Sequence, residues 1–125
     1  MTIRVYYEDT DCGGMVYYAN YLRYMERGRT ELLREHGIEL ADFHAQGVMF
    51  AVVDTHVRYR ASARYADLLT VETQITEKNS VSLTFDTKIY NQAGKLLTTS
   101  ETKLACITKD GKACRVPEEL AAALD

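Results

Sequence analysis

Hydrophobic and polar residues alternate with a period of two along most of the second half of the chain. The clearest run covers residues 81–89, in which hydrophobic residues and one threonine occupy every second position. Alternation of this kind is typical of a β-strand with one buried face. Turn sequences at residues 78–80 and 91–94 separate neighbouring runs. The strands that this pattern predicts cover residues 3–8, 48–60, 67–77, 81–89 and 95–107.

A period of three to four residues, which is typical of a helix, lies between the first two predicted strands. The predicted helix starts between Tyr17 and Tyr21 and extends to about His36, and Gly37 suits the left-handed position that ends a helix. Gly28 lies inside the helix at a cost of about 1 kcal/mol relative to alanine. We therefore expect close contact between the helix and a flat surface, such as a sheet. The residues expected on one helix face are Tyr18, Leu22, Met25, Arg29, Leu32, Leu33 and His36.

The order of these elements predicts an α+β fold. One strand and one long helix precede four strands with short connections, and short connections favour antiparallel neighbours. The apolar face of such a sheet needs a cover, and the long helix is the cover available. We expect an antiparallel sheet of about five strands wrapped around a central helix, in a single domain over residues 1–125. Pro117 suits the first turn of a short final helix over residues 118–124.

The composition is that of an ordinary globular protein. Hydrophobic residues make up 46% and charged residues 26% of the 125 residues, and a chain of this length can bury a core. The formal net charge is −3 and no basic run is present, which argues against a nucleic-acid partner. No apolar stretch approaches the roughly 20 residues that span a membrane. Residues 1–6 enter the strand pattern at once and leave no room for a signal peptide, so we expect a cytoplasmic protein.

The cysteines and histidines do not follow a metal-binding pattern. The cysteines are odd in number and scattered, and the histidines share no motif with them. Zinc sites need about four clustered ligands, so we expect neither a metal nor a cofactor. In a reducing compartment we also expect no structural disulfide. The residues concerned are Cys12, Cys106, Cys114, His36, His44 and His56.

The segment directly before the predicted helix is the strongest candidate for chemistry. Asp11 precedes the pair Gly13 and Gly14, which lets the backbone turn tightly and lets a ligand approach closely. A helix start offers unpaired N–H groups and a partial positive charge. The Tyr18 N–H could therefore hold a carbonyl oxygen while the Asp11 carboxylate acts on the adjacent carbon. The alternative is that Asp11 only caps the turn that the glycines close.

Other residues have both a functional and a structural interpretation. Six tyrosines in the first 24 residues could line a ligand cleft, or could belong to a subunit interface or a half-buried core. Arg58, Arg60 and Arg64 lie near a strand end, and Lys78 lies at a turn. They could bind the phosphates of a nucleotide-bearing substrate, although each alone is more often a solvated charge. Glu26 is expected beside the buried helix face, as a hydrogen-bonding group or a second catalytic carboxylate.

The residues around Asp11 resemble a known family. The run from Tyr7 to Tyr21, followed by Met-Glu-Arg-Gly-Arg-Thr-Glu over residues 25–31, strongly resembles the hotdog-fold acyl-CoA thioesterases. The signature Thr-Asp-x-x-Gly-x-Val-x-x-x-x-Tyr extends from Thr10 to Tyr21. The similarity is to the hydroxybenzoyl-CoA thioesterase class, and most of all to its Tol-Pal-associated acyl-CoA thioesterase branch. It covers the chain from Arg4 to about Pro117.

This resemblance implies a fold, a reaction and a set of site residues. The fold is a long helix wrapped by an antiparallel sheet, in agreement with the pattern above. The reaction is hydrolysis of a short-chain or aromatic acyl-CoA, in which Asp11 attacks the thioester carbonyl or activates water and the Tyr18 amide polarises the carbonyl oxygen. The site is expected between subunits of a homodimer or homotetramer. The substrate-binding residues implied are Gly14, Val16, Tyr17, Arg60, Arg64 and Lys78.

Three other functions are compatible with parts of the sequence. A hotdog dehydratase needs a histidine with an acidic partner near the helix, and no histidine lies between Met1 and Glu35, which argues against dehydration. A non-catalytic protein that binds acyl thioesters, or a scaffold protein, could keep the fold, although the presence of Asp11 and both glycines argues against loss of activity. A thioesterase that acts on acyl-carrier protein would use the same residues.

Overall fold

Five strands and three α-helices make up the structure, a computed structural model that describes residues 1–125. A short 3-10 turn, η1, lies at Tyr7–Asp9. The other elements are β1 Thr2–Arg4, α1 Asn20–Glu35, α2 Leu40–Ala45, β2 Val48–Tyr59, β3 Leu68–Lys78, β4 Ser82–Tyr90, β5 Leu96–Thr108 and α3 Glu118–Ala123.

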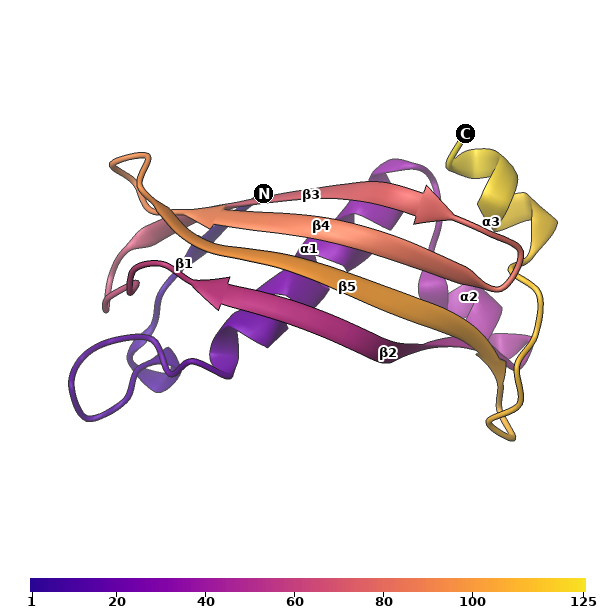
Figure 1. Cartoon of the computed structure of the whole chain (residues 1–125), viewed down its shortest axis with the longest axis horizontal. Coiled ribbons are helices and arrows are strands. Elements are labelled where there is room, and N and C mark those ends of the chain that lie inside the picture. Colours follow the sequence, from indigo (N-terminus) through magenta and orange to yellow (C-terminus); the bar gives the residue numbers. More distant parts are fainter.

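The strands form one antiparallel sheet in the order β1-β3-β4-β5-β2, and the sheet curls around α1 (Figure 1). Strand β2 lies at one edge and pairs only with β5. The helices α2 and α3 lie at one end of the sheet, and the segment that leads into α1 lies at the other (Figure 1). The predicted α+β architecture, an antiparallel sheet of five strands around one long helix, is confirmed.

Helix α1 covers the inner face of the sheet because one of its sides is largely apolar. Near its start, Tyr24 belongs to a buried cluster that includes Val71 of β3. Near its end, Leu33 belongs to a second buried cluster with Phe85 of β4, to which α3 contributes Leu120. The two clusters together form the core, and they fix the start of α1 at one end of the sheet.

Gly28 allows α1 to approach β3 closely. A Cβ atom at this position would lie 2.5 Å from Thr73 Oγ1 and 2.9 Å from Val71 Cγ1, both too close for a normal contact. The close approach that the sequence predicted is therefore confirmed. Gly37, directly after the helix, has a φ of +77° and occupies the predicted left-handed position.

The first strand is shorter than its pattern predicted. β1 ends at Arg4 rather than at residue 8. The Asp9 carboxylate accepts the Tyr6 N–H at 2.9 Å, and this bond folds the next residues into η1. A local hydrogen bond between side chain and backbone has thus overridden the alternating pattern.

The helices also differ in part from the predictions. The expected buried face included Tyr18, Leu22 and His36, which are all exposed. Met25, Arg29 and Leu33 of the expected face are buried, and near the start of α1 the inward positions belong to Tyr21 and Tyr24, which are 3% and 0% exposed. α2 was not predicted, since six residues are too few to show a clear helical period. None of the helices is long and apolar enough to cross a membrane.

Candidate active site

The predicted catalytic segment forms a loop at the end of the sheet next to the start of α1 (Figure 1). Thr10 and Val16 form an antiparallel bridge across its base, and the Val16 N–H donates to the Ala63 carbonyl oxygen at 2.9 Å. Met15 bridges Arg64, in the segment that leads into β3. The loop is therefore attached to the sheet at the point where β2 ends and β3 begins.

Asp11 is exposed, and its carboxylate closes the turn of this loop. Its Oδ1 accepts the Gly13 N–H at 2.9 Å and the Met15 N–H at 3.4 Å. Gly14 has a φ of +76°, which glycine adopts without strain. Asp11 therefore caps the turn, which is the alternative role that the sequence left open. The Oδ2 atom makes no hydrogen bond within the chain, so one carboxylate oxygen remains available.

Tyr18 lies just before the helix rather than in its first turn, where we expected it. α1 begins at Asn20, and the Tyr18 N–H donates no hydrogen bond within the chain. The Tyr18 carbonyl oxygen accepts the Tyr59 hydroxyl at 3.0 Å. The ring of Tyr18 also lies 4.9 Å from the ring of Tyr17 and 6.2 Å from that of Tyr59. These contacts hold a backbone segment that carries a free N–H donor.

The other loop residues predicted to bind substrate differ in exposure. Gly14 and Tyr17 are exposed, with Tyr17 50% exposed. Val16 is 5% exposed and belongs to the buried core, so its side chain is not at the surface of the loop. The predicted set thus contains two residues whose atoms are open to a ligand and one that supports the loop from beneath.

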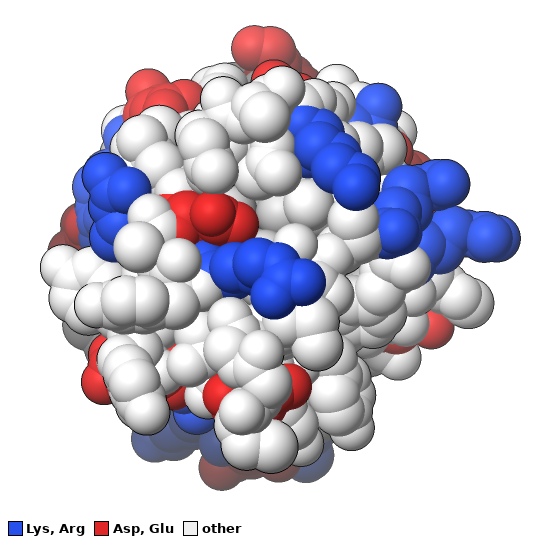
Figure 2. Space-filling model, turned by 90° about the vertical axis from the view of Figure 1, so that its left-hand side faces the viewer, with Lys and Arg blue, Asp and Glu red and all other residues white.

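Two of the predicted basic residues lie near the loop. Arg64 forms the bridge with Met15, and Arg60 follows the last residue of β2. Both are exposed, and neither belongs to an ion pair within the chain. Figure 2 views this end of the molecule and shows Lys and Arg side chains at several separate places, among uncharged residues and several Asp and Glu side chains. The end is thus open to an anionic ligand without being strongly basic.

Lys78 lies at the opposite end of the sheet from Asp11. The Asp11 loop adjoins the start of β3, whereas Lys78 is the last residue of β3, and a strand of this length spans roughly 35 Å. The Lys78 ammonium group also pairs with the carboxylate of Asp125. One protomer therefore does not bring Lys78 to Asp11, and the expected phosphate-binding group already has an anionic partner.

An apolar hollow of about 350 Å³ adjoins the candidate loop. Tyr7 and Tyr65 are 80% and 58% exposed, with ring centroids 6.0 Å apart in an edge-to-face arrangement. Tyr65 is tied to the loop because its N–H donates to the Gly14 carbonyl oxygen at 3.3 Å. Aromatic walls of this kind suit an apolar or aromatic group. The lining residues are Arg4, Val5, Tyr6, Tyr7, Tyr65 and Ala66.

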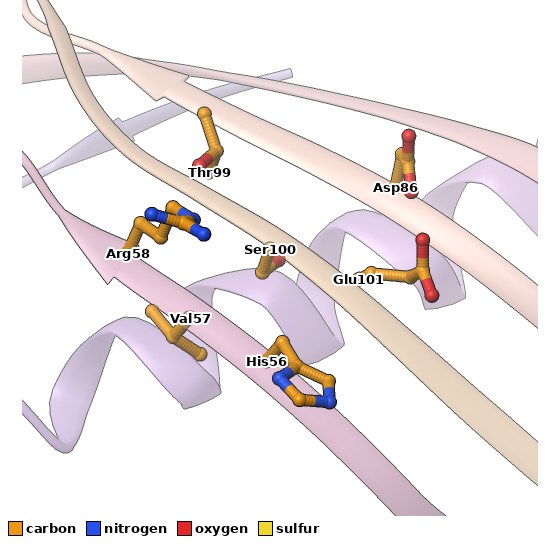
Figure 3. Close-up of a pocket in the computed structure, with 7 residues that line it drawn as sticks. All are labelled: His56, Val57, Arg58, Asp86, Thr99, Ser100 and Glu101. Atoms are coloured by element: carbon orange, nitrogen blue, oxygen red, sulfur yellow. The ribbon is translucent and has the colours of Figure 1, made fainter.

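A hollow of about 520 Å³ lies elsewhere, on the outer face of the sheet. Its lining includes His56 and Arg58 of β2, Asp86 of β4 and Glu101 of β5 (Figure 3). This lining is polar and mixed in charge, and does not suit an acyl chain. No group of three or more His, Cys, Asp or Glu side chains in the chain is arranged to hold a metal ion.

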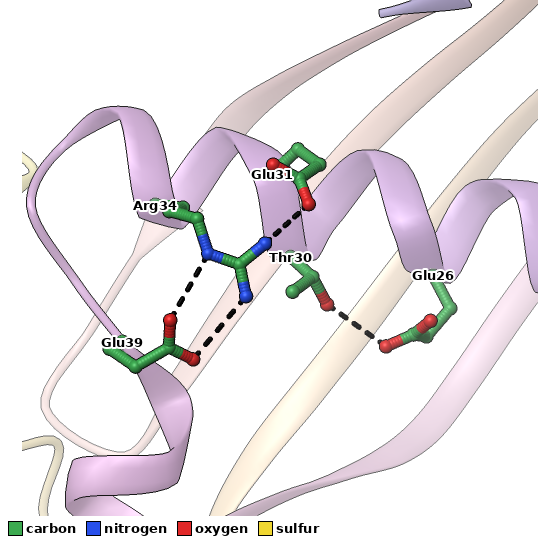
Figure 4. A network of polar contacts seen from close by, with 5 residues as sticks. All are labelled: Glu26, Thr30, Glu31, Arg34 and Glu39. Carbon is green, nitrogen blue, oxygen red and sulfur yellow. Dashed lines mark hydrogen bonds and ion pairs between the residues drawn. The ribbon is translucent and has the colours of Figure 1, made fainter. Parts of the chain in front are cut away.

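Glu26, the other acidic candidate, is exposed on α1, next to the buried Met25. Its Oε1 accepts the Thr30 hydroxyl at 2.9 Å (Figure 4). Nearby, Arg34 Nε donates to Glu39 Oε2 at 3.1 Å, and the same guanidinium group pairs with Glu31. Exposed ion pairs stabilise a protein little. These contacts are typical of a charged, solvated helix surface.

Comparison with known proteins identifies the family of the whole chain. A family model described as "Thioesterase-like superfamily" matches residues 5–124. The chain belongs to this superfamily. The acyl-CoA thioester hydrolase YbgC of Escherichia coli O157:H7 is 43% identical over 105 residues, which cover 84% of this chain and 78% of that protein. The acyl-CoA thioesterase YbgC of Haemophilus influenzae is 37% identical over 106 residues, which cover 84% and 77% of the two chains.

Solved structures show the fold of this thioesterase-like chain independently. The DHNA-CoA thioesterase from Staphylococcus aureus matches with a TM-score of 0.95 and 29% identity, covering 98% of this chain and 85% of that one. The 4-hydroxybenzoyl CoA thioesterase, solved with 4-hydroxybenzoyl CoA, has a TM-score of 0.90 at 21% identity, covering 100% and 96%. The hotdog fold implied by the resemblance is confirmed.

Two residues that support the loop of this thioesterase-like chain were not singled out from the sequence. Asp9 binds the Tyr6 N–H, and Tyr59 holds the carbonyl oxygen of Tyr18. Asp9 had a usable signal, because a carboxylate three residues after the start of a turn can reach back to a free N–H. Tyr59 had none, since 41 residues separate it from Tyr18 and only the folded sheet brings the two together.

Proposed function

We propose that this acyl-CoA thioester hydrolase uses Asp11 as its catalytic carboxylate and the Tyr18 N–H as the donor to the thioester carbonyl oxygen. One observation carries the proposal. A carboxylate with an unpaired oxygen and an amide with an unpaired N–H belong to one loop of a chain that is 43% identical to the E. coli acyl-CoA thioester hydrolase. Thioester hydrolysis needs both kinds of group.

Each group has a distinct task in the reaction. The Tyr18 N–H stabilises the negative charge that develops on the carbonyl oxygen. Asp11 either attacks the carbonyl carbon through Oδ2, expelling the thiolate of coenzyme A and forming a mixed anhydride that water opens, or it accepts a proton from the attacking water. Label found in the Asp11 side chain after a single turnover in isotopically labelled water would establish the anhydride route, because no label enters a carboxylate that only accepts a proton.

The substrate class we propose is a short-chain or aromatic acyl-CoA. The hollow next to the loop has Tyr6, Tyr7 and Tyr65 in its walls and a volume of about 350 Å³, which suits a compact or flat acyl group better than a long chain. Arg60 and Arg64 lie unpaired near the same loop, and guanidinium groups bind phosphate well. They are the proposed contacts for the anionic part of coenzyme A.

We also propose that two copies of the chain share the site. β2 is a 12-residue edge strand with one side unpaired, and its Val52 and Val53 are 52% and 56% exposed. A long, exposed edge strand is a ready surface for pairing with another strand. Antiparallel pairing of two β2 strands reverses the second protomer, so its Lys78 end lies beside the Asp11 end of the first. Light scattering should therefore give a dimer or a tetramer, and an active monomer would contradict this proposal.

The decisive experiment for the reaction is the substitution Asp11→Asn. Asparagine keeps an oxygen that can accept the Gly13 N–H, so the turn and the melting temperature should be retained. We expect kcat on a series of aliphatic and aromatic acyl-CoAs to fall about 100-fold or more. Cys12→Ser, at the exposed neighbouring position, is the matched control and should leave kcat unchanged. If the Asp11→Asn variant has the same kcat as the wild type, the catalytic role of Asp11 is refuted. If the wild-type protein binds acyl-CoA but does not hydrolyse it, a non-catalytic acyl-thioester-binding protein is favoured.

A further inference from the structure

Cys106, near the end of β5, and Cys114 lie opposite one another across the short turn that follows this strand. Ile107 and Ala113 form an antiparallel bridge. The next pair away from the turn is therefore Cys106 and Cys114. The Cys114 N–H donates to the Cys106 carbonyl oxygen at 3.0 Å. Side chains at such opposite positions point to the same face, with Cβ atoms about 4.5–5.5 Å apart. Both cysteines are free, and their thiol sulfurs are in contact at 3.0 Å.

The two thiols have different surroundings. Cys106 is 1% exposed and belongs to the buried cluster that contains Phe85 and Val116. Cys114 is half-buried, so a reagent in solution can reach it. Burial, and then the neighbouring Cys114 thiol, raises the pKa of Cys106 to about 12. At neutral pH Cys106 therefore stays protonated and unreactive until its neighbour has been activated.

We propose that Cys106 and Cys114 form a reversible oxidation site, which closes into an intrachain disulfide when the protein meets a peroxide or a small disulfide such as oxidised glutathione. With the small disulfide, the Cys114 thiolate attacks one of its sulfurs and releases one thiol. Cys106 then loses its proton and attacks the Cys114 sulfur, which releases the second thiol. With a peroxide, Cys114 first takes up one oxygen to give a sulfenic acid, and Cys106 displaces that oxygen as water. In both routes the reagent accepts two electrons, and an added thiol reverses the step.

The disulfide would fix the point where the chain leaves the sheet for its C-terminal segment. Two residues after Cys114, the Val116 N–H donates to the Ser80 carbonyl oxygen at 2.8 Å. Farther along, Leu120 is 0% exposed in the core and Asp125 pairs with Lys78. The segment thus covers the turn between β3 and β4. A covalent bond at its root removes freedom from the unfolded chain, so the oxidised protein should melt several degrees higher than the reduced one.

The experiment uses full-length Cys12→Ser protein, because the exposed Cys12 could otherwise link two molecules. The protein is treated with oxidised glutathione, denatured, alkylated and digested with trypsin. Lys109 and Lys112 lie between the two cysteines, so trypsin separates them unless they are bonded. We expect both alkylatable thiols to disappear, and dithiothreitol to restore them. The expected product is the peptide Leu104–Lys109 joined to the peptide Ala113–Arg115.

The matched control is the double variant Cys12→Ser/Cys114→Ser. It should give no linked peptides and no rise in melting temperature with oxidant, and its Cys106 should remain unmodified because it is buried. Retention of both free thiols in Cys12→Ser protein after treatment would overturn the proposal, as would a stable glutathione adduct at Cys114 without the link. If the double variant does not fold, the linked peptides from Cys12→Ser protein still decide the question. The result is independent of Asp11 and of thioesterase activity.

Discussion

The Asp9 carboxylate accepts a hydrogen bond from the side-chain amide of Asn20, with Oδ1 and Nδ2 3.1 Å apart. Its other oxygen accepts the Tyr6 N–H at 2.9 Å, and its backbone carbonyl oxygen accepts the Tyr17 N–H at 3.0 Å. Asn20 is the first residue of α1 and is 9% exposed. A single residue thus joins the chain before the Asp11 loop, the chain after it and the start of the helix.

Replacement of Asp9 should therefore affect both stability and catalysis. We expect Asp9→Ala to lower the free energy of unfolding by about 1–3 kcal/mol, because it leaves the Asn20 amide and the Tyr6 N–H without their acceptor. It should also lower kcat, since the lost carboxylate ties the start of α1, two residues after Tyr18, to the chain before the loop. Urea unfolding and acyl-CoA kinetics measure the two effects. Glu8→Ala, at the exposed neighbouring position, is the control, and equal behaviour of the two variants would show that Asp9 does not hold the loop.

The elements with a regular period could be predicted from the sequence because each has one buried face. The alternation over residues 81–89 matches β4, and the three-to-four-residue period before Gly37 matches α1. Even Gly28 could be interpreted, because a glycine inside a helix needs a reason such as close packing. The errors lie where local hydrogen bonds compete with periodicity, as when Asp9 ends the first strand early.

The site could be predicted only in part, because it depends on contacts between distant segments. Asp11 and its glycines lie within one short stretch, so their spacing alone indicated a turn. The contact from Tyr59 to Tyr18 and the pairing of Lys78 with Asp125 join residues 41 and 47 positions apart. No local pattern contains such contacts. The candidate loop could therefore be located from the sequence. The hydrogen bond from Tyr59 that holds it and the ion pair between Lys78 and Asp125 could not.

Lys78 provides a test of coenzyme A binding. If its ammonium group contacts the phosphates, it must leave Asp125, so the two anions compete for it. We expect Lys78→Ala to raise KM for an acyl-CoA several-fold while leaving KM for the matching pantetheine thioester unchanged. Asp125→Asn should lower KM for the acyl-CoA, because it removes the competing carboxylate. Steady-state kinetics with both substrates measure this, and equal effects of Lys78→Ala on the two KM values would exclude a phosphate contact.

The same residue tests whether the site is shared between subunits. In a mixed dimer of Asp11→Asn and Lys78→Ala chains, a shared site combines the intact Asp11 of one chain with the intact Lys78 of the other. After random exchange half of the dimers are mixed, and each mixed dimer has one intact site of two. We therefore expect mixing to raise activity at low acyl-CoA concentration above the mean of the two separate variants, toward a quarter of the wild-type value. Each variant mixed with itself is the control. No gain on mixing, with subunit exchange verified by mass spectrometry, would mean that Asp11 and Lys78 do not act across an interface.

Gly28→Ala should destabilise the protein although alanine favours helices. The propensity gain is about 1 kcal/mol, but the new methyl group would lie 2.5 Å from Thr73 Oγ1. Overpacking of this kind typically costs about 1–3 kcal/mol. The double variant Gly28→Ala/Thr73→Ala should recover part of the loss, because the Thr73 hydroxyl is buried without a hydrogen-bond partner. Urea unfolding gives the values, and a more stable Gly28→Ala protein would show that α1 can move away from β3 freely.

The hydroxyl group of Tyr24 makes the stability of the protein sensitive to alkaline pH. Tyr24 is 0% exposed, and its hydroxyl has no hydrogen-bond partner. Burial, followed by the nearby Asp9 carboxylate, raises the pKa of Tyr24 above its ordinary value. The folded state therefore resists ionisation that the unfolded chain undergoes near pH 10. The stability due to this difference is present below about pH 10 and is lost as the pH rises toward the folded-state pKa.

Tyr24→Phe tests this relationship because it removes the ionisable group and keeps the ring. At about pH 8 we expect the variant to be at least as stable as the wild type, since it removes a buried hydroxyl that has no partner. Between about pH 8 and about pH 11, its free energy of unfolding should fall less than that of the wild type. Part of the fall should remain, because burial also raises the pKa of Tyr21. Urea unfolding across this range measures both slopes, and parallel slopes would mean that Tyr24 ionises as readily in the folded protein as in the unfolded chain.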